Sequence, residues 1–71
     1  MYIRSQDKRE LIEFHGLQVA CLGGSYYIRP LNMDSYHNIG NYKSKERCIA
    51  VLDEIQHSLE IGTIIFEMPK E

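Results

Sequence analysis

One amphipathic stretch constrains the fold of this 71-residue chain more than any other feature. Apolar side chains recur at i, i+3, i+4, i+7 and i+11 in this stretch, and this spacing places them on one helical stripe about 100° wide. The stripe consists of Cys48, Val51, Leu52, Ile55 and Leu59. The sequence therefore predicts a helix from Lys45 to about Leu59, and the rest of the chain must supply the surface that covers the stripe.

Both ends of this helix carry the expected signals. Ser44 is a favourable N-cap residue, and Glu46 places a carboxylate in the first turn, at the positive end of the helix dipole. A full capping box would need Glu or Gln at the third helical position, where the chain has Arg47. Gly62 stands where a left-handed residue is expected to end the helix.

Ahead of the helix the sequence pattern becomes that of β-strands. Residues 17–21 alternate with period two, which predicts a half-buried strand with Leu17, Val19 and Cys21 facing inward. Gly23-Gly24 can take the positive φ values of a tight hairpin turn, so the return strand is expected at 25–29. Further short strands or extended segments are expected at 1–4, 39–42 and 63–68, and residues 11–14 are expected to be either extended or a short helical segment.

These elements predict an α+β fold in a single domain that spans residues 1–71. Its expected architecture is a small antiparallel sheet of three to five strands, covered on one face by the single C-terminal helix. One helix covers only one face of a sheet, and residues 63–68 form a β-branched strand of low charge with an edge that is expected to stay open. We therefore expect a homodimer that hides this edge or the uncovered face.

The composition is that of an ordinary globular domain, with 44% hydrophobic and 25% charged residues and a net charge of −2. The charge gives the whole molecule no bias toward nucleic acid, so nucleic acid is not expected to be its main partner. No apolar run approaches the roughly 18 residues of a membrane span, and charged residues interrupt any secretory segment after Met1. The expectation is a cytoplasmic protein without a membrane contact.

No catalytic or metal site is expected. Cys21 and Cys48 are too far apart for a Cys-x-x-Cys motif, and both fall on apolar faces, so they are expected to be small buried hydrophobes. Asp53, His57 and Glu60 are spaced i, i+4 and i+7, which places three potential metal ligands near one helical face. That face lies opposite the apolar stripe, where such side chains usually form solvated contacts. We therefore predict no enzyme and no cofactor.

The aromatic and arginine side chains are the candidates for a binding site. Tyr26 and Tyr27 are adjacent in a strand and must face opposite sides of the sheet, so one of them is left outside. Outward tyrosines could form a stacking surface, with arginines beside it for a phosphate or carboxylate. The candidate residues are Arg4, Tyr27, Arg29, Tyr36 and His37. The alternative interpretation is that the tyrosines fill a small core and keep their hydroxyls at its rim.

Four segments resemble one group of proteins. They are Tyr2–Lys8 (YIRSQDK), Gly40–Arg47 (GNYKSKER), Val51–Ile55 (VLDEI) and Phe66–Pro69 (FEMP). Together they are similar to small uncharacterised proteins of Gram-positive bacteria, their phages and other mobile elements. The resemblance covers both ends of the chain and is weak between positions 17 and 38. It implies a genetic setting and no particular chemistry.

Three functional hypotheses follow. The leading one is a non-enzymatic accessory protein of phage or mobile-element type that acts by binding a host or viral protein. The second is a protein that binds or sequesters a small ligand or nucleotide through the aromatic and arginine residues. The third is a nucleic-acid binding module that uses Lys43, Lys45 and Arg47, whose charges would otherwise form an ordinary solvated surface.

Overall fold

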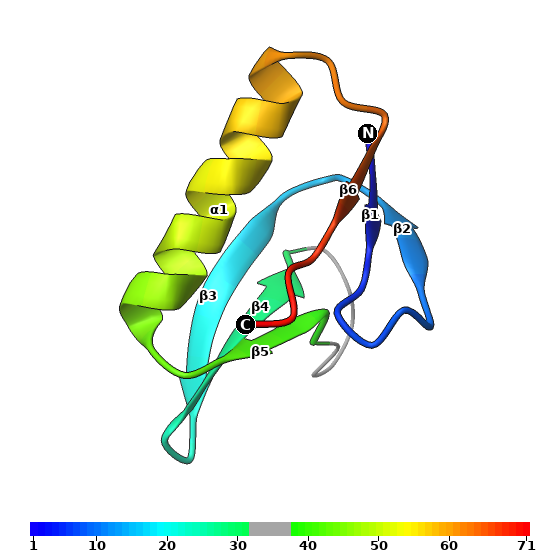
Figure 1. Ribbon diagram of the computed structural model, residues 1–71. Coiled ribbons are helices and arrows are strands. Elements are labelled where there is room, and N and C mark those ends of the chain that lie inside the picture. The colour runs from blue at the N-terminus through cyan, green and yellow to red at the C-terminus, as the bar shows by residue number, and fades with distance from the viewer. Residues whose placement is uncertain (32–37) are drawn as a thin grey trace.

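Two three-stranded sheets and one helix make up the described part of the chain, residues 1–31 and 38–71 of a computed structural model (Figure 1). The elements are β1 (Tyr2–Arg4), β2 (Leu11–Glu13), β3 (Leu17–Leu22), β4 (Ser25–Pro30), β5 (Gly40–Tyr42), α1 (Lys45–Glu60) and β6 (Ile65–Glu67). The predicted α+β class with one C-terminal helix is confirmed for these residues. The strands, however, divide between two sheets.

The first sheet has the strand order β3-β4-β5 and is antiparallel throughout. Its hairpin turns at Gly23 and Gly24, whose φ values of 58° and 82° are those of a type I′ turn, as the sequence predicts. Because cross-strand partners share a face, Tyr26 lies on the same face as its partner Tyr42. Tyr27 lies on the opposite face.

The second sheet has the order β2-β1-β6, and β6 runs parallel to β1. Two parallel strands need a long crossover connection. Here the connection contains the whole first sheet and the helix, so the sheet joins segments that are far apart in the sequence (Figure 1). Because β1 pairs with β6 and β2, these three strands form a sheet of their own and do not join the single antiparallel sheet that was expected. Local sequence patterns predict strands, but they do not predict which distant strands pair.

The helix begins and ends where the sequence predicts. The hydroxyl of Ser44 accepts a hydrogen bond from the Arg47 amide at 3.0 Å. After the helix, Gly62 has a φ of 80°, and the Thr63 amide donates to the carbonyl of Ser58 at 2.9 Å, as in a Schellman motif. The prediction for Leu59 is wrong: its side chain is 44% exposed, because the last turn of the helix extends past the core.

The core lies between α1 and the first sheet, and the second sheet contributes to it. Its buried residues are Ile3, Ile28, Ile39, Tyr42, Cys48, Val51, Ile55 and Met68. Cys21 was expected among them but is exposed, because residues 21–24 form the solvated end of the hairpin. Among the described residues, no helix is both long and apolar enough to span a membrane.

Candidate functional site

The aromatic and arginine candidates do not all come together. Tyr27 and Arg29 are two residues apart on β4, so they share the face of the first sheet that is turned away from the core. Arg4 lies in the second sheet, where its guanidinium donates to the carbonyl of Lys8 at 3.2 Å. The other two candidates, Tyr36 and His37, lie outside the described residues.

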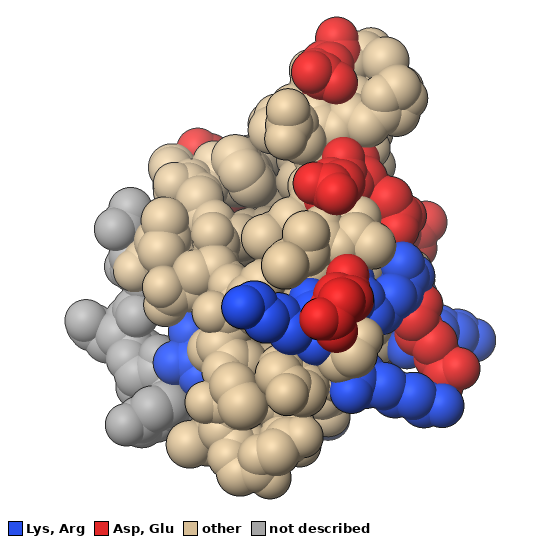
Figure 2. All heavy atoms as spheres, turned by 90° about the vertical axis from the view of Figure 1, so that its left-hand side faces the viewer, with Lys and Arg blue, Asp and Glu red and all other residues tan. Residues whose placement is uncertain are grey.

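The basic residues of the third hypothesis do gather at the start of the helix. Figure 2 shows basic side chains at the level where α1 begins and acidic side chains toward its C-terminal end. Lys43 and Lys45 are exposed, and Arg47 is half-buried. Lys43 and Arg47 line a pocket, which Lys45 does not.

This hollow, which we call the helix-start pocket, has a volume of about 510 Å³. It lies between the tip of the β3–β4 hairpin, β5, the first turn of α1 and the tail after β6. Its lining residues are Gly24, Ser25, Asn41, Tyr42, Lys43, Arg47, Lys70 and Glu71. Three of these side chains are basic and one is acidic. The pocket is therefore assembled from segments that are distant in the sequence.

Three contacts fix the Arg47 side chain as one wall of the pocket. Its guanidinium carbon lies 5.8 Å from the centroid of the Tyr42 ring, in cation–π contact. One terminal nitrogen lies 3.1 Å from the carboxylate of Glu54, and the other donates to the carbonyl of Glu71. Tyr42 itself is only 4% exposed, so its ring offers no free stacking surface.

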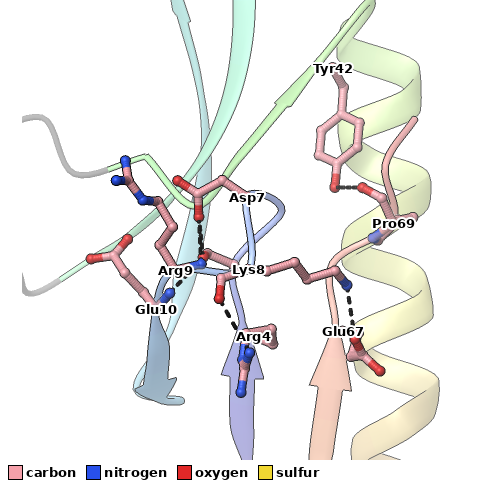
Figure 3. A network of polar contacts seen from close by, with 9 residues as sticks. Arg4, Asp7, Lys8, Arg9, Glu10, Tyr42, Glu67 and Pro69 are labelled. Carbon is pink, nitrogen blue, oxygen red and sulfur yellow. Dashed lines mark hydrogen bonds and ion pairs between the residues drawn. The ribbon is translucent and has the colours of Figure 1, made fainter.

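The tail that carries the pocket residues Lys70 and Glu71 is held in place by a hydrogen bond from Tyr42. The Tyr42 hydroxyl donates to the carbonyl of Pro69 at 2.7 Å (Figure 3). Burial raises the pKa of Tyr42 to about 12, which keeps this hydroxyl protonated as a donor. Met68, next to Pro69, is buried in the core. These contacts hold the tail against β5.

Gln6, in the turn between β1 and β2, also contacts the tail that follows β6. Its side-chain nitrogen lies within hydrogen-bond distance of the carbonyls of Asn41, Pro69 and Lys70, at 3.1, 3.2 and 2.6 Å. Its side-chain oxygen accepts from the Asn41 amide at 2.8 Å. Nothing in the sequence marks Gln6, because a single glutamine in a polar turn carries no recognisable pattern. It nevertheless links the β1–β2 turn, β5 and the tail.

The β1–β2 turn that carries Gln6 is fixed by its own polar contacts. Asp7 accepts from the Ser5 hydroxyl at 2.7 Å and from the Arg9 amide at 3.0 Å, and these hydrogen bonds lower the pKa of its carboxyl group. The ammonium group of Lys8 lies 2.8 Å from the carboxylate of Glu67 on β6 (Figure 3). The turn is therefore tied to both sheets.

A second candidate surface surrounds β6, which lies at an edge of its sheet. We call it the β6 edge surface, and it consists of Tyr2, Ile61, Ile64 and Ile65, which are 43%, 67%, 76% and 50% exposed. The Ile64 carbonyl and the Met68 amide both hydrogen-bond to β1. Because backbone groups alternate along a strand, those of Ile65 and Glu67 point away from β1, toward the open edge.

The helix residues considered as metal ligands form no cluster. His57 lies 3.9 Å from Glu60, and both side chains are exposed, as expected for a solvated contact. Within residues 1–31 and 38–71, no group of three or more His, Cys, Asp or Glu side chains could hold a metal ion. Cys48 is buried as predicted, and this burial raises the pKa of its thiol.

No protein-family model, curated protein or solved structure matches this chain, so the helix-start pocket and the β6 edge surface are interpreted from their geometry.

Proposed function

We propose that this protein acts by protein–protein contact through the β6 edge surface, as a non-enzymatic accessory protein of the phage or mobile-element type that its sequence resembles. The observation that carries the proposal is the exposure of three isoleucines, Ile61, Ile64 and Ile65, beside an open strand edge. Large exposed apolar patches mark interaction surfaces in soluble proteins, and Ile65 lies beside the exposed Tyr2, its partner on β1. An open edge adds backbone donors and acceptors that a second strand can pair with.

The chemistry of the edge favours a second copy of the chain as the occupant. Residues 61–66 carry no charged side chain, so two copies can meet there without placing like charges opposite each other. Two acidic residues flank this run: the Glu67 carboxylate is paired with Lys8 at 2.8 Å, and the Glu60 carboxylate lies 3.9 Å from His57. A two-fold axis would place the same apolar patch of both subunits in contact and would pair one β6 with the other. The protein is then a homodimer whose remaining surface meets a host or viral partner.

Sedimentation velocity over the micromolar range tests this proposal. We expect the wild-type protein to sediment as a dimer and Ile65→Lys as a monomer, because a lysine in the interface would bury a charge without a partner. The matched control is Leu22→Lys, which changes a 58% exposed side chain on the hairpin. It should remain a dimer. A folded wild-type monomer over the whole range would contradict the proposal, as would equal dissociation of both variants.

A further inference from the structure

We propose that the helix-start pocket binds a small anion that carries phosphate groups, with a diphosphate as the simplest form. Lys43 and Lys70 would hold its oxygens, and Arg47 would form the fixed positive wall beside them. The pocket is a separate site from the β6 edge surface, and its ligand does not depend on the function proposed above. The inference rests on the charge of the pocket, its size and the way in which its walls are held.

The charge of the pocket is opposite to that of the whole molecule. The chain has a net charge of −2, whereas three basic side chains and one acidic side chain line the pocket. Arg47 is paired with Glu54. Within the described part of the chain, Lys43 and Lys70 line this pocket and form no ion pair, so neither ammonium group has a carboxylate partner. A bound anion would supply one, and phosphate oxygens accept charge-assisted hydrogen bonds from ammonium groups.

Several side chains that line the pocket can bind a phosphate group, whereas its one aromatic ring, that of Tyr42, is already engaged. Its volume of about 510 Å³ is that of a small-molecule site. Ser25 and Asn41 add a hydroxyl and an amide to the lining, and the space beside the Cα atom of Gly24 is open. The ring of Tyr42 is buried and already in contact with the Arg47 guanidinium, so it is not free to stack on a base. Lys43, Lys70, Ser25 and Asn41 remain available as donors for an anion.

The walls of the pocket are already fixed in place without a ligand. Lys43 stands between β5 and the N-cap residue Ser44, and so between two ordered elements. The backbone carbonyl of Lys70 lies 2.6 Å from the side-chain nitrogen of Gln6, which holds that residue beside the pocket. Little conformational entropy of the backbone would be lost on binding, and this favours affinity. Arg47 is a positioning residue here, because its donors are engaged by the protein itself.

A titration with pyrophosphate, followed by amide NMR shifts at roughly physiological ionic strength, tests the proposal. The pocket variant is Lys43→Gln combined with Lys70→Gln. The control is Lys45→Gln, which removes one such charge from the first turn of α1, at a residue that does not line the pocket. Because the pocket variant removes two charges, Lys43→Gln alone is measured as the comparison of equal charge. We expect saturable shifts at the wild-type pocket, a Kd about tenfold or more higher in the pocket variant, and a Kd within about twofold of wild type in the control.

Two further comparisons extend this experiment. The affinity for ADP against that for pyrophosphate shows whether the ligand is a nucleotide or a free diphosphate, and the affinity of Lys45→Gln against that of the pocket variant shows whether binding is specific to the pocket. ADP binding more tightly than pyrophosphate would support a nucleotide as the ligand, and equal affinity would support a free diphosphate. An absence of saturation with both probes would overturn the proposal. A loss of affinity in Lys45→Gln as large as in the pocket variant would also overturn it, because it would indicate a diffuse basic surface. Thermal melts of all variants show that they are folded, and Ile65→Lys should leave pyrophosphate binding unchanged.

Discussion

The two sheets of this protein are built in different ways. The sheet β3-β4-β5 contains a hairpin between neighbouring segments, and α1 packs against it. The sheet β2-β1-β6 joins the first strand of the described chain to the last, Lys8 links its β1–β2 turn to β6, and Gln6 fastens it to β5 of the first sheet. Its strand β6 lies at the sheet edge. The comparison indicates that short-range pattern accounts for the β3–β4 hairpin of the first sheet, whereas the parallel pairing of β1 with β6 depends on long-range contacts, both polar and in the core.

The largest expected effect tests whether the two sheets share one core. Ile28 on β4 and Ile3 on β1 are both 0% exposed. We expect Ile28→Ala and Ile3→Ala each to lower the free energy of unfolding by about 2–5 kcal/mol, because each leaves a cavity in the core. Chemical denaturation measures both, with the exposed Ile49→Ala as the control. A loss below about 1 kcal/mol for Ile3→Ala alone would mean that the second sheet contributes little to the core.

A smaller effect is expected where the two sheets meet. A Cβ atom on Gly40 would lie 2.7 Å from a ring carbon of Tyr42 and 2.8 Å from the terminal carbon of Met68. Gly40→Ala should therefore destabilise the protein by about 1–3 kcal/mol through overpacking. Asn41→Ala, at the exposed next position, is the control for denaturation experiments. If both variants are equally stable, β5 and the tail are not tightly packed together.

The next prediction concerns how much the hydrogen bonds of the Gln6 side chain contribute to stability. Gln6→Ala removes the side chain that contacts Asn41, Pro69 and Lys70. We expect a loss of about 1 kcal/mol in the free energy of unfolding, because the exposed carbonyls of Asn41 and Lys70 and the part-buried contact to Pro69 lose a donor. Gln18→Ala changes an exposed glutamine of the first sheet and should have almost no effect. Equal values for the two variants would show that the fastening contributes nothing to stability.

The effect confined to the narrowest range of conditions is a pH dependence from Tyr42. The pKa of its hydroxyl rises from the ordinary 10.0 to about 12 in the folded protein, chiefly because of burial. Its contribution to stability is therefore complete below pH 10 and is lost as the pH rises to 12. Denaturation midpoints between pH 9 and pH 12 should fall more steeply for the wild type than for Tyr42→Phe. Parallel pH curves would contradict the assignment of a buried, protonated hydroxyl.

The sequence predicts those parts of the fold that depend on neighbouring residues. The helix with its caps and the Gly23-Gly24 hairpin are of this kind, because periodicity and glycine conformation act locally. The parallel pairing of β1 with β6 is not predictable in this way, since no local pattern names a distant partner. Burial predicted from periodicity is wrong for Cys21 and Leu59, because it does not show where an element extends past the core.

The candidate sites also combine features that depend on neighbouring residues with features that depend on distant parts of the chain. The basic residues at the helix start are visible in the sequence, but only the fold separates Lys45 from the pocket that Lys43 and Arg47 line. The contribution of Lys70 depends on the tail returning to β5, which the sequence does not indicate. The open edge of residues 63–68 was expected from their β-branched, low-charge character, and β6 does lie at a sheet edge.

Amide hydrogen exchange at β6, measured by NMR at micromolar and at millimolar protein concentration, tests the central claim most directly. Two copies paired through β6 should protect the amides of Ile65 and Glu67 at the higher concentration, because these groups point to the open edge. The Phe66 amide, on the β1 side, is the internal control and should exchange equally at both concentrations. Exchange of Ile65 and Glu67 that does not change with concentration, while the protein remains folded, would contradict association through the β6 edge surface.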